Sequence, residues 1–81
     1  MSKAIIMSDK DNVATALDEL KEGEKVTIKN GEEREVTISQ DIPFGHKFAI
    51  RAIEKGEQIL KYGEVIAGAT QGIQEGEHVH V

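Results

Sequence analysis

The apolar positions of this chain follow a helical spacing in one stretch and a strand-like alternation over most of the remainder. Residues 3–7 contain a first short apolar run, which predicts a strand. The polar segment 9–12 then offers several side chains that can cap a helix. Apolar residues recur after it at intervals of three and four, which predicts one short helix near residues 12–21: Val13, Ala16, Leu17 and Leu20. Gly23 is well placed to end this helix.

Beyond Gly23 the pattern is that of short strands separated by turns. Val26 and Ile28 alternate with polar residues, and the stretch 35–38 provides a partner strand. Asn30-Gly31 between them is a strong hairpin signal, because both central residues of a type I′ turn need positive φ. Four further stretches predict strands: 47–52, 58–61, 64–69 and 78–81.

Four segments share a local element, in which an apolar residue lies three positions before a glycine turn and a predicted strand follows. The copies are segments 20–24, 42–46, 53–57 and 73–77. Their irregular spacing argues against a solenoid and favours a single kind of turn that is reused in a compact β domain. Glutamate follows the glycine in three copies, whereas His46 takes that place in the other.

Length and composition limit the classes to which the protein can belong. Eighty-one residues predict one domain, residues 1–81, and such a domain buries roughly 60% of its unfolded surface, so a partner can complete its small core. The chain has no cysteine, which excludes disulfides and thiol catalysis. Its formal charge of −5, without a basic stripe, argues against nucleic-acid binding. No apolar run is long enough for a signal peptide or a membrane span, so we expect a cytoplasmic protein without membrane contact.

The three histidines are the main candidates for chemistry. His78 and His80 are two residues apart, so in a strand they project from one face. Together with His46 they make a possible ligand set for a divalent metal such as Fe, Mn, Mg or Zn. The alternative is that His78 and His80 are surface side chains on a solvated edge strand.

Two lysines stand beside these candidates in the sequence. In Gly45-His46-Lys47, the histidine is a candidate acid, base or ligand, and Lys47 is a candidate partner for a substrate carboxylate. Lys61 precedes Tyr62-Gly63 and forms either a positive edge beside a site or the corner of a hairpin. The alternative for the first segment is a turn and strand whose charged residues face water.

Four short motifs occur in a characteristic order: Asp11-Asn12-Val13-Ala14, Gly45-His46-Lys47-Phe48-Ala49, Lys61-Tyr62-Gly63 and Gly76-Glu77-His78-Val79-His80. Their order and spacing resemble the SAF (antifreeze-like) domain of the altronate/galactarate dehydratase family, over nearly the whole chain. The resemblance implies a mostly β, β-clip fold of short bent strands. It also implies a carbon–oxygen lyase that dehydrates a sugar acid such as altronate or galactarate, or the related sulfolactate sulfo-lyase, which releases sulfite.

In that family the domain is the first part of a long enzyme or a separate small subunit. We therefore expect a large dehydratase subunit or domain as partner, a small acidic sugar-derived substrate, and no activity of this chain alone. We expect His46, His78 and His80 to contribute to a site that the large part completes. We also expect the large part to determine most of the substrate specificity. The family pattern usually continues past Val81 into a further histidine, so we expect either that the chain is truncated or that the site is incomplete here. The alternatives are a non-catalytic ligand-binding module of the antifreeze-like class and a purely structural assembly subunit.

Overall fold

The structure, a computed structural model, describes residues 3–6, 8, 10–30, 32–61 and 64–79. The described residues form short strands and turns without a helix, so the predicted mostly β fold of short, bent strands is confirmed. None of them belongs to a helix that is long and apolar enough to cross a membrane. The strands are β1 (Ala4–Ile5), β2 (Val13–Ala16), β3 (Lys25–Asn30), β4 (Glu32–Thr37), β5 (Lys47–Ala49), β6 (Gln58–Lys61), β7 (Glu64–Gly68) and β8 (His78–Val79).

The predicted helix near residues 12–21 is wrong, because its first turn is strand β2. β2 pairs antiparallel with both β1 and β5, so its backbone groups bond to neighbouring strands and not along a helix. Val13, Ala14 and Ala16 are all buried, and they face two different cores. A strand that is buried on both faces shows no alternation of apolar and polar residues, and here its apolar positions happened to match a helical spacing.

Strand pairing arranges the chain as two long hairpins that bend back on themselves. The first hairpin keeps one register from the central sheet to its tip, and every pair is centred on residue 31: Val13 with Ala49, Leu20 with Ile42, and Lys25 with Thr37. The predicted pairing of β3 with β4 is thereby confirmed, while Gly31 itself lies outside the described residues.

The second hairpin repeats this plan with residue 63 as its centre. Its pairs are Lys47 with Val79, Ile53 with Ile73, and Gln58 with Gly68, and a β-bulge then shifts the register between Ile59 and Leu60. Strand β5 belongs to both hairpins, since it pairs with β2 on one side and with β8 on the other. The two halves of the chain are therefore joined by a shared strand.

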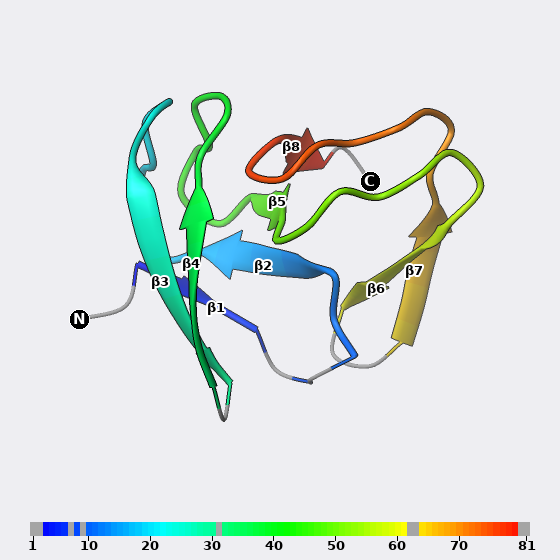
Figure 1. Cartoon of the computed structure of the whole chain (residues 1–81), viewed down its shortest axis with the longest axis horizontal. Coiled ribbons are helices and arrows are strands. Elements are labelled where there is room, and N and C mark those ends of the chain that lie inside the picture. Colours follow the sequence, from blue (N-terminus) through cyan, green and yellow to red (C-terminus); the bar gives the residue numbers. More distant parts are fainter. Residues whose placement is uncertain (1–2, 7, 9, 31, 62–63, 80–81) are drawn as a thin grey trace.

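Two small hydrophobic cores lie on opposite faces of the central sheet, whose strand order is β1-β2-β5-β8. Ala14 and its partner Phe48 belong to the core under the β3–β4 hairpin, whereas Val13 and its partner Ala49 belong to the core that includes Ile59 of β6. Figure 1 shows the β3–β4 and β6–β7 hairpins at opposite ends of the central strands. Each hairpin thus covers one face of a sheet only a few residues long.

All four copies of the glycine turn have the same backbone conformation. Their glycines have φ between +78° and +88°. In each copy the residue after the glycine donates its N–H to the carbonyl three positions earlier, at 2.9 to 3.1 Å. This is a type II turn, which requires positive φ at its third residue. Each turn also exchanges two backbone hydrogen bonds with one residue elsewhere: Gly23-Glu24 with Ile38, Gly45-His46 with Ala16, Gly56-Glu57 with Ala69, and Gly76-Glu77 with Ala49. The recurring segment is therefore a true structural unit.

Asn12 ties the second hairpin to the central sheet. Its side chain is buried, its Nδ2 group donates to the carbonyl of Gln58 at 2.8 Å, and its Oδ1 accepts the N–H of Leu60 at 2.8 Å. The backbone N–H of Asn12 also donates to the carbonyl of Leu60 at 3.2 Å. The amide side chain of Asn12 supplies both the donor and the acceptor that these two backbone groups need, which gives the Asp11-Asn12-Val13-Ala14 motif a physical role.

Candidate functional site: a histidine pair beside a polar pocket

His46 occupies the end of the second glycine turn and leads directly into β5. Its N–H donates to the carbonyl of Pro43 at 3.1 Å, and its carbonyl accepts the N–H of Ala16 at 2.9 Å. Gly45, with φ of +82°, makes this turn possible, and its N–H donates to the carbonyl of Ala16 at 2.9 Å. The backbone of His46 is thus fixed on both sides while its imidazole remains exposed.

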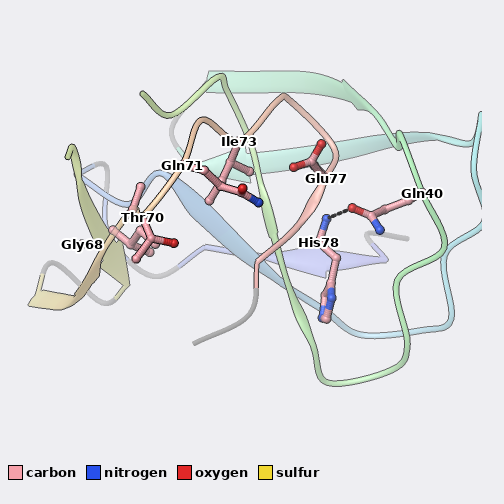
Figure 2. A pocket seen from close by; sticks show the side chains of 9 residues that line it. Gln40, Gly68, Thr70, Gln71, Ile73, Glu77 and His78 are labelled. Carbon is pink, nitrogen blue, oxygen red and sulfur yellow. Dashed lines mark hydrogen bonds between the residues drawn. The ribbon is translucent and has the colours of Figure 1, made fainter. Parts of the chain in front are cut away.

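His78 is the first residue of β8, and the fourth glycine turn places it. Gly76 is buried, donates its N–H to the carbonyl of Ala49 at 2.7 Å, and accepts the N–H of Ser39 at 2.9 Å. The N–H of His78 donates to Oε1 of Gln40 at 2.9 Å (Figure 2). β8 is therefore held both by its pairing with β5 and by the segment that follows β4.

The two described histidines are in direct contact. Nδ1 of His46 lies 2.9 Å from Nε2 of His78, and the ring centroids are 5.0 Å apart with an angle of 31° between the planes. Because one nitrogen must donate and the other accept, the neutral pair shares one proton across this contact. In either arrangement, one of the two remaining ring nitrogens carries a proton and the other does not. The neutral pair therefore contains both a proton donor and a proton acceptor.

The other predicted site residues either lie apart from the histidine contact or fall outside the described part of the chain. Lys47 is half-buried in β5, and the alternation of side chains along a strand places it on the face opposite Phe48. The structure does not bring Lys47 into the contact between His46 and His78. The side chain of Lys61, at the end of β6, and the whole of His80 lie outside the described residues.

The chemistry of the histidine pair fits part of a divalent metal site. Two imidazole nitrogens 2.9 Å apart can both bind Fe or Zn once the proton between them is lost, whereas Mg and Mn prefer oxygen ligands. Among the described residues, no three His, Asp or Glu side chains gather closely enough to hold a metal ion together. Any metal held by His46 and His78 therefore needs further ligands from elsewhere.

A pocket of about 300 Å³ lies next to His78, and the sequence patterns did not reveal it. It combines polar side chains with a small apolar surface: Gln40, Ile59, Gly68, Ala69, Thr70, Gln71, Ile73, Glu77 and His78. Figure 2 shows Gln40 and His78 on one side of the pocket and Thr70 on the other. The sequence does contain one signal for the pocket, a polar dipeptide that occurs in both halves. Ser39-Gln40 begins three positions before Ile42, and Thr70-Gln71 begins three positions before Ile73.

The equivalent carboxylates of the first and third turns have a structural role. Glu24 accepts the N–H of Lys21 at 3.2 Å and pairs with Lys3 at 2.7 Å, while Glu57 accepts the N–H of Glu54 at 3.0 Å and pairs with Arg51. The hydrogen bond from the paired cation lowers the pKa of each carboxyl below its usual value. These glutamates brace their turns, and His46 occupies the matching place beside the candidate site.

Comparison with known proteins agrees with the motifs. Residues 2–81 match the family model described as the altronate/galactarate dehydratase SAF domain. The chain is 47% identical over 70 residues to the altronate dehydratase of Escherichia coli (strain K12) and 36% identical over 81 residues to that of Bacillus subtilis (strain 168). These matches cover 86% and 100% of this chain but only 14% and 16% of the two dehydratases.

A shorter relative is also similar over much of its length. The chain is 40% identical over 55 residues to the (2R)-sulfolactate sulfo-lyase subunit alpha of Paracoccus pantotrophus, which covers 68% of this chain and 81% of that subunit. The resemblance expected from the four motifs is confirmed by the family match and by both kinds of relative. This chain belongs to the altronate/galactarate dehydratase SAF domain family.

Proposed function

We propose that this chain is the SAF domain or small subunit of a carbon–oxygen lyase that removes water from a sugar acid. The observation that carries the proposal is the contact between His46 and His78 beside a polar pocket, in a chain of this family. The similar altronate dehydratases support a hydroxylated acid as substrate. The remaining part of the enzyme completes the site.

The histidine pair suits the proton transfers of an elimination. Dehydration of a hydroxy acid removes a proton next to the carboxylate and protonates the leaving hydroxyl. A pair that holds one protonated and one unprotonated outer nitrogen provides an acid and a base a few ångströms apart. We assign the acid–base role to His46, which is the more exposed imidazole, and an orienting role to His78. Lys47 and Lys61 attract the substrate carboxylate from the edge of the site.

In an alternative form of this proposal, His46, His78 and His80 are ligands of a divalent metal, and His46 and His78 then no longer share a proton. Such an ion, Fe or Zn by the preference of imidazole, would supply electrostatic stabilisation of the negative charge that forms next to the carboxylate. The large part of the enzyme provides the remaining ligands.

Exposed apolar side chains beside the histidines mark the surface for the large part. Phe44 precedes Gly45 at the tip of the second turn and is 71% exposed, and Leu17 is 46% exposed. Leu17 follows Ala16, whose carbonyl accepts the N–H of Gly45, so the two apolar residues flank one backbone contact. More than four fifths of each similar altronate dehydratase lies outside the matched region, which supplies the partner for this surface.

The test is a lyase reconstituted from this chain and its large subunit. We expect His46→Gln to lower kcat for altronate at least about 100-fold, because loss of a general acid or base typically costs that much. His78→Gln and His80→Gln lower bound metal as well as turnover. Lys55→Gln, an exposed change at the tip of the third turn, serves as the control and leaves both unchanged. Unaltered turnover and metal content in the triple histidine variant would rule out the proposed role.

A sulfolactate sulfo-lyase is the second candidate. It is favoured by the match to a subunit alpha of which this chain covers 81%. The same reconstituted enzyme distinguishes the two reactions, since one forms a dehydrated keto acid from altronate or galactarate and the other releases sulfite from sulfolactate. Sulfite release without sugar-acid turnover would replace the first proposal by the second.

A further inference from the structure

The pocket beside His78 is lined by groups suited to hydroxylated ligands. Its interior is apolar at Ile59 and Ala69, which are 2% and 6% exposed. Gln40, Thr70 and Gln71 add two amides and a hydroxyl, which both donate and accept hydrogen bonds. A volume of about 300 Å³ lies at the lower end of the range for ligand sites, as expected for a small metabolite.

One polar group of the pocket is already held in place. Oε1 of Gln40 accepts the backbone N–H of His78 at 2.9 Å, so the orientation of this amide is set by β8 (Figure 2). The amide nitrogen of Gln40 is the donor that remains for a ligand. His78 lines the pocket and also belongs to the contact with His46, so one residue of β8 is common to the pocket and to the histidine pair.

The charge of the pocket is its most selective property. Among the nine described residues that line it, Glu77 is the only carboxylate, and neither lysine nor arginine is present. A second negative charge within a few ångströms of Glu77 is disfavoured, the more so when a partner covers the site and lowers the local dielectric. A carboxylate accepts hydrogen bonds from hydroxyl groups, so an uncharged polyol is favoured in the same place.

We propose that this pocket binds the uncharged, hydroxylated end of an aldonate, and that Glu77 disfavours sugar acids with a carboxylate at both ends. This proposal rests on the proposed function and narrows its substrate class. Altronate has one carboxylate and a terminal hydroxymethyl group, whereas galactarate has two carboxylates. The single carboxylate of an aldonate points out of the pocket, towards the part of the site that the large subunit completes.

Binding to the 81-residue chain tests this proposal without catalysis. In an NMR titration, altronate is expected to shift the backbone amide signals of Thr70, Gln71 and His78, and galactarate to bind about tenfold more weakly, a difference of about 1.4 kcal/mol. Glu77→Gln removes the difference between the two ligands. Glu35→Gln removes the same charge from an exposed position in the middle of β4 and preserves the difference.

The outcomes separate this proposal from the proposed function. Equal affinity of the wild-type chain for altronate and galactarate, absence of altronate binding, or shifts confined to residues outside the pocket would overturn the pocket assignment. If altronate binds as expected but the reconstituted enzyme does not dehydrate it, the proposed function fails and the pocket stands. If the enzyme dehydrates both acids equally well before and after Glu77→Gln, the lyase stands and the pocket assignment fails.

Discussion

Among the six glycines that the structure describes, Gly76 is the one whose replacement by alanine should damage the fold most. A Cβ atom at Gly76 would lie 1.9 Å from the carbonyl oxygen of Thr37 and 2.8 Å from both Cα of Ile38 and N of Ser39. All three are backbone atoms, so the end of β4 must move to admit a methyl group. Gly56 provides the matched control, because it has a φ of +87° in the same kind of turn and a Cβ atom added there would meet nothing within 4 Å.

The comparison separates backbone strain from steric overlap. Alanine at either position must adopt a left-handed conformation, which costs about 1–2 kcal/mol. At Gly76 the overlap adds about 1–3 kcal/mol, the usual range for forcing an extra methyl group into a packed site. A domain of this size has a total free energy of unfolding of about 4–12 kcal/mol. Gly76→Ala is therefore expected to remove a large fraction of it.

Thermal and denaturant unfolding measure this difference. For a domain of this size each kcal/mol corresponds to about 4–8 °C, so Gly76→Ala should lower Tm at least about 4 °C further than Gly56→Ala. The variant should also lose turnover in the reconstituted enzyme, because the turn at Gly76 places Glu77 and His78. Equal losses of stability in the two variants would refute the steric argument, because only the cost of the left-handed backbone conformation, which both variants share, would then remain.

Three further predictions concern other contacts of the fold. Asn12→Ala leaves two partly buried backbone groups of β6 without their side-chain partners and should cost about 2–4 kcal/mol in denaturant unfolding; a loss below about 1 kcal/mol would contradict this. Because the pKa values of Glu24 and Glu57 are lowered in the folded chain, their contribution to stability is present above their usual value near 4.5 and is lost as the pH falls through the lowered values. Glu24→Gln and Glu57→Gln should therefore make stability less dependent on pH in that acidic range, and an unchanged acid unfolding curve would exclude this role. Phe44→Ser should weaken binding to the large subunit at least about tenfold without lowering Tm, whereas Phe44 would not belong to the interface if affinity stayed the same.

Local signals predicted most of the strands and the repeated turn. The four similar segments around Gly23, Gly45, Gly56 and Gly76 all form type II turns, in which the glycine supplies the positive φ. Gly68 and Gly72 also follow an apolar residue by three positions but lack positive φ, so the spacing alone does not identify the turn. The alternation around Asn30-Gly31 likewise identified β3 and β4. β2 was missed because its burial on two faces is a tertiary property, created by two cores that are assembled from distant segments.

The candidate site was only partly predictable, because local sequence signals do not show which distant segments meet. His46 and His78 stand out as rare residues next to glycine turns, and the structure brings their rings together. The spacing of His78 and His80 along a strand did not indicate this contact, which joins residues 32 positions apart. Gln40, Thr70 and Gln71 are common polar residues in connecting segments, so only the folding of both hairpins onto β5 reveals that they share a pocket.

The matching registers of the two halves show that one strand–turn–hairpin–turn arrangement is used twice in the domain. His46 and Glu77 are the same position in the two copies, since each follows the glycine of the turn that docks on the central sheet. One copy now carries an imidazole that contacts His78, and the other carries the carboxylate that lines the pocket. A difference at one repeated position thus gives the two halves of the domain chemically different turns, one that presents an imidazole to His78 and one that presents a carboxylate to the pocket.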